Sequence, residues 1–256
     1  ALPTLPQECT DYGTGDALQL GYQSMSRWLT AMDATDEHFC YARVDEASGR
    51  PVLYWCDVVA GGSPELTGHY SFTGAQVSVL RIEGTRVAAM LTDGNWRVVE
   101  FAVPGDPVVI ASPGASSGCR DLDLAGDLVV TAQDSSLVIT SLASGDTQEI
   151  GRYAPARSSA YSRGVTIHSL DVVWPRCWAL VAEDYDTGYY TYDLVILDLT
   201  DAAAPVVLDS RRVGTSNYPY VTTFGAVRAE GSRACVGSRS ENVDTWIHDP
   251  YIITGL

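Results

Sequence analysis

The sequence predicts an all-β fold, a five-bladed β-propeller built from four-stranded antiparallel blades. Three observations lead to this prediction. Short apolar segments recur along the 256 residues, with Gly, Asp and Asn turn signals between them. Four such segments form a unit that repeats at intervals of roughly 40–57 residues, a spacing typical of propeller blades. No stretch keeps a helical period of apolar residues over three turns.

The unit is clearest in DLVILDLTDAAAPVVL, residues Asp193–Leu208, where two apolar strands flank an Asp/Ala/Pro turn. Its first strand recurs as the third strand of each unit, at Leu53–Val58, Arg97–Val103, Leu137–Ala143, Leu194–Thr200 and Tyr251–Leu256. Two strands precede each copy, and one strand follows each of the first four copies. The predicted blades span approximately residues 26–73, 75–111, 119–153, 165–213 and 222–256, in a single domain over residues 1–256.

The fifth unit lacks an outer strand, because the sequence ends just after its third strand. An unassigned segment near the start, Thr14–Gln23, resembles Ser144–Tyr153, the fourth strand of the third unit, in its Gly-Asp pair, its apolar spacing and its aromatic residue. We expect Thr14–Gln23 to complete the last blade, because pairing removes an exposed strand edge. A fragment of a larger ring is the alternative. The first residues look like a mature, processed start.

The segment LVILDLTDAAAP resembles the LVIVD repeat of bacterial and archaeal secreted or cell-surface proteins. The close match covers Leu194–Leu208, whereas the other units match only in pattern, with Glu100 and Thr140 in place of the Asp. The resemblance implies a β-propeller fold and an extracellular or cell-surface location. It transfers no catalytic residues, because the repeat is a structural motif.

The six cysteines argue against zinc, because the sequence has no C-x-x-C and no Cys/His cluster. Their even number indicates disulfides and an oxidising compartment. A hairpin with a turn at 47–49 would place Glu46 opposite Arg50 and Cys40 opposite Cys56, within disulfide range. We therefore predict a Cys40–Cys56 bridge. The pairing stays open for Cys9, Cys119, Cys177 and Cys235.

The charge is strongly acidic, with 32 Asp and Glu against 16 basic residues, all of them Arg. A net charge of −16 repels nucleic acid and anionic membranes, so neither is expected as a partner. No apolar run approaches the roughly 18 residues of a membrane span. The absence of Lys excludes a Schiff-base lysine and a Walker A lysine. No organic cofactor is expected.

Two kinds of loop share one face of the predicted propeller, the turn between the second and third strands and the connection to the next blade. They lengthen toward the end of the chain, at 154–164, 184–193, 214–220 and 241–250, and are rich in Tyr, Arg and Ser. Binding residues usually sit on such loops, with Tyr, Trp and Arg as anchors. The candidate ligand-binding residues are Arg157, Tyr161, Arg163, Tyr185, Tyr189, Tyr190, Tyr218, Tyr220, Trp246 and His248. The alternative is that these aromatic residues pack the loops against one another.

One of these loops resembles the start of a calcium loop, with Asp184, Asp186 and Gly188 at alternate positions. Asp193 could supply a further carboxylate. Tyr190 stands where a third acid would follow, and the distal Glu is missing, so a solvated turn is the other interpretation. A structural calcium ion is the one metal that the sequence suggests.

The first strands of the units would line the centre of a propeller. Near their starts they offer Arg27, Val77, Asp121, Asp123, His168 and Thr223. Paired-carboxylate catalysis needs two facing groups about 5–9 Å apart, and only the third unit supplies acids. We expect Asp121 and Asp123 to cap a turn or line the channel with water, and His168 to be a packing residue.

These observations favour a non-catalytic extracellular or cell-surface module that recognises a protein or a polysaccharide through a Tyr/Arg-rich loop face. A carbohydrate-active hydrolase or lyase using Asp121 or Asp123 is one alternative. A structural subunit of an extracellular assembly is the other. The sequence leaves the ligand and the oligomeric state open.

Overall fold

The computed structural model describes residues 29–58, 65–103, 105–113, 118–143, 147–185, 189–216, 221–242, 245–247 and 250–253. The regular elements in these residues are β-strands. No helix with the length and apolar character of a membrane span occurs in this described part of the chain.

The strands form five four-stranded antiparallel sheets, so the predicted four-stranded antiparallel units are confirmed. The first two sheets contain β1 (Leu29–Ala34), β2 (His38–Val44), β3 (Pro51–Asp57) and β4 (Glu65–Ser71), then β5 (Val77–Glu83), β6 (Arg86–Leu91), β7 (Trp96–Glu100) and β8 (Val108–Ala111). The third contains β9 (Cys119–Ala125), β10 (Leu128–Gln133), β11 (Ser136–Ser141) and β12 (Gln148–Tyr153). The last two contain β13 (Ser162–Val173), β14 (Arg176–Tyr185), β15 (Tyr189–Asp198) and β16 (Val206–Ser216), then β17 (Val221–Glu230), β18 (Arg233–Asn242), β19 (Thr245–Ile247) and β20 (Pro250–Ile253).

The turn between the first and second strands is set by glycine in three sheets. Gly84, Gly126 and Gly231 have φ angles of 56°, 58° and 58°, a conformation that other residues rarely adopt. All three belong to turn signals that are visible in the sequence. Each turn joins two strands in two residues and so fixes their register.

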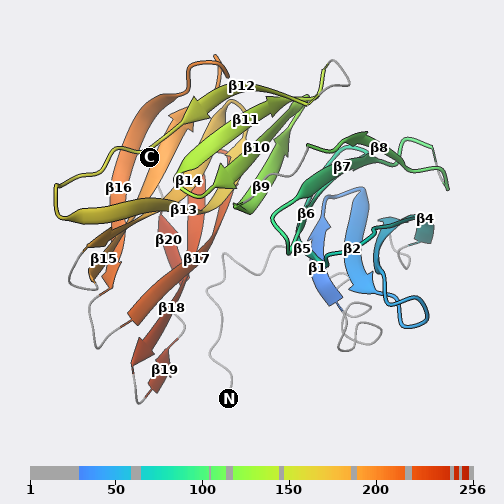
Figure 1. The fold of residues 1–256 in the computed structure, drawn as a ribbon, viewed down its shortest axis with the longest axis horizontal. Helices are drawn as coiled ribbons and strands as arrows, with labels where there is room; N and C mark the ends of the chain where they lie inside the picture. Colours follow the sequence, from blue (N-terminus) through green and yellow to red (C-terminus); the bar gives the residue numbers. More distant parts are fainter. Residues whose placement is uncertain are drawn as a thin grey trace.

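The sheets follow one another in chain order, from the blue β1–β4 through the green and yellow sheets to the red β17–β20 (Figure 1). Their first strands lie side by side in the series β1, β5, β9, β13 and β17. Each hydrophobic cluster lies between two consecutive sheets. Between the first two sheets, for example, Trp55 stacks on Phe101 with 5.0 Å between the ring centroids. The core is therefore divided into layers that hold neighbouring sheets together.

Close packing between the third and fourth sheets depends on Gly151 in β12. A Cβ atom at this position would overlap the backbone carbonyl oxygen of Ala202, in the turn after β15. The absence of a side chain thus lets β12 approach the Asp/Ala/Pro turn of the next sheet.

The third position of the last sheet is shared by two short strands. β19 pairs with one end of β18 and β20 with the other, while β17 occupies the opposite edge of β18. No described strand pairs with the outer edge of β20. The segment expected there, Thr14–Gln23, lies outside the described residues.

The predicted Cys40–Cys56 bridge is wrong. β2 pairs with β3 so that Val44 faces Pro51, which puts Cys40 opposite Trp55 and Cys56 opposite Phe39. The hairpin loop is longer than the three residues expected, and the register slips by one. A one-residue slip sends the two thiols to opposite faces of the sheet. Both are free and buried, as are Cys119 and Cys177.

Candidate ligand-binding cavity

Each first strand carries a β-bulge at the same place. One extra residue interrupts the pairing with the second strand between Leu29 and Ala31, Val77 and Val79, Cys119 and Asp121, Ile167 and Ser169, and Phe224 and Ala226. The bulge residues are Thr30, Ser78, Arg120, His168 and Gly225. Bulges turn side chains away from the regular alternation of a strand and are common beside functional sites.

The bulge residues differ in how they use their side chains. Thr30 and Ser78 donate hydrogen bonds to Ala42 O and Met90 O across the hairpin, both at 3.3 Å. The side chains of Arg120 and His168 are not used in this way. Arg120 is half exposed, and its ion pair with Asp134 is long, at 4.0 Å between Nη2 and Oδ1. His168 packs edge-on against Tyr192.

A cavity of about 300 Å³ lies where the first strands meet. All five of these strands contribute to its wall, with Ala31, Met32, Ser78, Val79, Leu80, Arg81, Arg120, Asp121, His168, Ser169, Ala226 and Arg228. β1 and β17, from the two ends of the series, are both represented. Three of the charged lining residues are Arg, whereas one is an acid.

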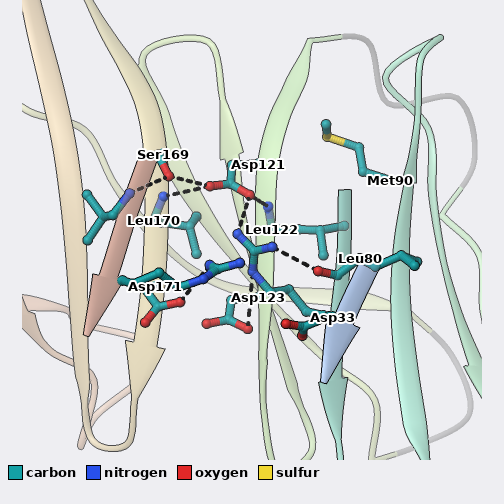
Figure 2. Close-up of polar contacts among 12 residues, drawn as sticks. Asp33, Leu80, Met90, Asp121, Leu122, Asp123, Ser169, Leu170 and Asp171 are labelled. Atoms are coloured by element: carbon teal, nitrogen blue, oxygen red, sulfur yellow. Dashed lines mark hydrogen bonds and ion pairs between the residues drawn. The ribbon is translucent and has the colours of Figure 1, made fainter. Parts of the chain in front are cut away.

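Two rows of polar side chains tie the first strands together, and Figure 2 shows Asp33, Asp123 and Asp171 in one row and Asp121 with Ser169 in the other. In one row, Asp33 accepts a hydrogen bond from Ile82 N at 2.8 Å, Asp123 from Val172 N at 2.6 Å and Asp171 from Ala229 N at 2.6 Å. Each bond joins an acid to the backbone of the next sheet. These carboxylates are therefore cross-links between sheets, and they satisfy backbone groups that the sheet pairing leaves free.

The second row centres on Asp121 and Ser169, which lie one residue after their bulges. Asp121 Oδ2 accepts from Ser169 Oγ at 2.6 Å and from Leu170 N at 3.0 Å. Ser169 Oγ in turn accepts from Val227 N at 3.2 Å. The row thus connects β9, β13 and β17 and holds β13 in place at the two residues that follow His168.

Arg81 joins the two rows. Its Nη2 donates to Asp121 Oδ1 at 3.1 Å, and its Nη1 donates to Leu80 O at 2.8 Å. Its Nε is buried without a hydrogen bond, 4.0 Å from Asp123 Oδ1. On the other side of the cavity, Arg228 Nη1 donates to Asp171 Oδ1 at 3.0 Å. Arg81 and Arg228 are therefore both neutralised by carboxylates.

Burial changes the protonation of three groups around the cavity. Burial and then the neighbouring Asp171 raise the pKa of Asp123 to about 7. Burial also raises the pKa of Asp171. The pKa of His168 is lowered, first by burial and then by the positive charge of Arg120. Arg120 and His168 both line the cavity.

The loop face differs from its expected form. The predicted loop 184–193 is mostly hairpin, because β14 runs to Tyr185 and β15 begins at Tyr189, with Asp184 paired to Tyr190. Its Tyr- and Thr-rich sequence suits a strand as well as a loop. Likewise, β16 extends to Ser216, and β18 extends to Asn242.

The structure brings three of the predicted binding residues together at the end of the fourth sheet. Tyr185 OH donates to Glu183 Oε2 at 2.9 Å and lies 2.7 Å from Ser158 Oγ. Arg157 Nη1 donates to Ser162 O at 3.3 Å, and the Tyr189 ring lies 5.6 Å from that of Tyr185. These contacts fasten the connection 154–161 onto the sheet, as the packing alternative expected.

Glu183 is the centre of this small network. Burial alone would raise its pKa, but hydrogen bonds from Ser158 and Tyr185 lower it. The carboxylate accepts from Ser158 N at 2.8 Å. It therefore acts as a charged anchor for the loop.

The remaining predicted binding residues are dispersed. Tyr161 is 77% exposed and Tyr190 38% exposed, Arg163 lies exposed in β13, and Trp246 lies in β19. Tyr218, Tyr220 and His248 fall outside the described residues.

The acids proposed for calcium do not converge among the described residues. Asp184 pairs with Tyr190 and Asp193 pairs with Val181, so the two acids lie three residue pairs apart in the β14–β15 pairing. Asp193 is also bound to Arg212, at 2.6 Å between Oδ1 and Nε. Asp186 is outside the described residues, in which no group of three or more His, Cys, Asp or Glu gathers as a metal site requires.

Sequence reasoning found Asp121, Asp123 and His168 but missed Asp33, Arg81, Asp171 and Arg228. A signal for them exists. The row position, occupied by Asp33, Arg81, Asp123, Asp171 and Arg228, is the third residue before the turn that ends each first strand. Aligning the units on that turn, instead of on the third strand, would have revealed a charged residue in every unit.

Comparison with known proteins bears on the fold alone. No family model matches the sequence, and no curated protein matches it. A solved structure of the computationally designed Ika8 protein is similar, with a TM-score of 0.50 and 13% identity, covering 88% of this chain and 71% of that one. The computationally designed Ika4 protein has a TM-score of 0.45 and 13% identity, covering 72% of this chain and 94% of that one. The likeness to Ika8 supports the all-β architecture and is silent on ligand and reaction.

Proposed function

We propose that this chain is a non-catalytic binding module, a five-bladed β-propeller whose ligand site is the central cavity. In this proposal the five sheets are the blades, and Thr14–Gln23 closes the ring on β20. The LVIVD resemblance supports a place outside the cell, on the surface or secreted, which protease accessibility on intact source cells would test.

The observation that carries the proposal is the cavity wall, to which every first strand contributes. Strands at the two ends of the series can share one cavity if the sheets are arranged around an axis. A volume of about 300 Å³ also lies within the range of small-ligand pockets. Three of the five bulge residues, Ser78, Arg120 and His168, line it with side chains that the regular strand pairing would have directed elsewhere.

Binding is favoured over hydrolysis because the acids are already occupied. Asp121 accepts hydrogen bonds from Arg81, Leu122 N, Ser169 and Leu170 N, at both of its oxygens. Asp123 accepts from Leu124 N and Val172 N and is 8% exposed. A general acid or base needs an oxygen that can reach substrate. These carboxyl groups instead bond to the backbone and side chains of the scaffold.

The partner class follows from where the cavity lies. The bulges lie in the part of the first strands that precedes the carboxylate row, toward the end from which the connection 154–161 emerges. Exposed Tyr161 and Tyr190 belong to that end of the fourth sheet. A saccharide chain or a protein terminus that extends from the cavity toward that end of the fourth sheet would also meet these aromatic side chains.

A glycan and peptide array, run beside a broad glycosidase and lyase screen, tests the proposal. We expect binding without turnover. His168→Ala, which changes the cavity wall, should bind at least tenfold more weakly. The control His69→Ala, in the outer strand β4 of the first sheet, should bind like the parent. Binding that His168→Ala leaves intact would place the site elsewhere. Turnover that disappears in Asp123→Asn would replace the module by an enzyme.

A further inference from the structure

We propose that the cavity selects an oxyanion, a carboxylate or sulfate group on its ligand, and holds it between the Arg120 guanidinium and the His168 imidazole. This inference rests on the proposed function and names the ligand chemistry of the same site. It begins with the charges of the cavity wall, which differ from the chain as a whole. The chain carries −16, whereas the wall contains three Arg, one His and one Asp.

Two of the three arginines are already neutralised. Arg81 is bonded to Asp121, with side chains that are 11% and 7% exposed, and the half-exposed Arg228 is bonded to the buried Asp171 at 3.0 Å. Asp121 is itself saturated by four donors. Each pair places a carboxylate within hydrogen-bond distance of its guanidinium, which reduces the positive charge that Arg81 and Arg228 offer a ligand.

Arg120 is different. Its ion pair with Asp134 is 4.0 Å long, and Asp134 is 71% exposed and therefore well solvated. The guanidinium is thus a half-exposed cation on the cavity wall with most of its five donors available. A planar fork of donors matches a carboxylate or sulfate in two parallel hydrogen bonds.

His168 occupies the same bulge position on the next strand, so the two side chains project from neighbouring strands at one level. Its ring contacts Tyr192 on one side and the cavity on the other. Both side chains line the cavity, and burial and then the positive charge of Arg120 lower the pKa of His168. An oxyanion between them would offset that positive charge and accept a hydrogen bond from each.

The position of His168 is rigid before any ligand arrives. Ser169, its neighbour, donates to Asp121 on β9 and accepts from Val227 N on β17. The bulge is therefore fixed by both adjacent sheets. A site fixed in this way loses less conformational entropy on binding.

The experiment is an NMR titration of the His168 imidazole at constant ionic strength, with three probes. Sodium sulfate and sodium glucuronate test the oxyanion, and glucose is the neutral counterpart of glucuronate. We expect the two anions to move the His168 resonances and to raise its pKa, since a bound anion stabilises the imidazolium. The other charged residues of the cavity wall are Arg81 on β5, Arg120 and Asp121 on β9 and Arg228 on β17. The titration is repeated in the Arg120 variants below, which change the one of these groups that the inference invokes.

Arg120→Gln should weaken anion binding at least tenfold, and Arg120→Lys should restore part of it. The control Arg50→Gln removes the same charge from the exposed β2–β3 loop and should bind like the parent.

Sulfate and glucuronate that leave the His168 resonances unmoved would overturn the inference, as would anion binding that survives Arg120→Gln. Glucose binding as tightly as glucuronate would also overturn it while leaving the central cavity as a binding site. Binding of glucuronate without sulfate would support the inference and assign the site to a sugar carboxylate.

Discussion

At the scale of the residue, Asp123 shows how a carboxyl group becomes part of the scaffold. It lies between the third and fourth sheets, accepts a hydrogen bond from Val172 N and is shielded from solvent. Its pKa of about 7, raised by burial and by Asp171, means that the folded chain holds a proton there that the unfolded chain has lost. Charge at this position opposes folding, although the backbone hydrogen bonds partly compensate for it.

The sign of the resulting pH dependence follows from linkage. An Asp in the unfolded chain titrates near pH 3.9, so between about pH 4 and pH 7 the folded state binds more protons. The contribution of Asp123 to the free energy of unfolding is therefore full below about pH 4 and is lost as pH rises through 7. Asp171, whose pKa is also raised, acts in the same direction, whereas His168, whose pKa is lowered, opposes both.

Urea unfolding from pH 4 to pH 8 checks this prediction. We expect Asp123→Asn to flatten the decline of the free energy of unfolding across that range, because the amide has no proton to lose. Asp106→Asn, an exposed position in the β7–β8 connection, should keep the slope of the parent. Equal slopes for the parent and Asp123→Asn would show that Asp123 is ionised throughout.

At the scale of the element, the contact between β12 and the turn after β15 couples two sheets through backbone alone. The apolar strand pattern that dominates the sequence predicts neither this contact nor its dependence on Gly151. Ile150, Tyr153 and Ala202 pack around it as part of the cluster between the third and fourth sheets. The Asp/Ala/Pro turn after β15 thus packs against the third sheet as well as against its own, the fourth.

Gly151→Ala should destabilise the chain by about 1–3 kcal/mol, the usual cost of forcing extra atoms into a packed contact. The added methyl group meets the Ala202 carbonyl, which is backbone and cannot turn aside. Gly164→Ala in β13 is the matched control, because no atom lies within 4 Å of a Cβ there. Thermal unfolding of both variants decides the point, and equal melting temperatures would refute the close contact.

At the scale of the whole molecule, the proposed ring depends on the edge of β20. If Thr14–Gln23 pairs there, removing residues 1–23 exposes a strand edge in the last sheet and breaks the link between the two ends of the series. We expect the truncated chain to melt lower, by about 2–4 °C for each kcal/mol lost in a domain of this size. Calorimetry of the two chains measures it, and an unchanged melting temperature would mean that the first 23 residues do not close the ring.

The repeat pattern predicted the strands and their grouping in fours, because each strand must alternate or fill an apolar layer and each turn needs Gly, Asp or Asn. It did not predict register where the loop length was ambiguous. The loop between β2 and β3 is one residue longer than expected, and the shifted register places Cys40 and Cys56 on opposite faces of the sheet. It also missed the extension of β14 and β15, because Tyr and Thr serve loops and strands equally well.

The candidate site was harder to predict because its key feature is an irregularity. Arg120 and His168 interrupt their strands, and nothing in their immediate sequence marks a bulge. The apolar residues around His168 in the sequence predict a packing residue. Only the comparison of all five first strands in space shows that the two residues occupy one position.

The bulges carry a consequence for how this molecule could change over time or in the laboratory. Thr30, Ser78, Arg120, His168 and Gly225 occupy five equivalent places on one frame, and the apolar layers between the sheets lie elsewhere. Three of them, Ser78, Arg120 and His168, line the cavity, so a substitution at one changes part of the wall and leaves the other two as they are. Recognition in this chain can therefore be altered one position at a time, as a combination of three separate choices.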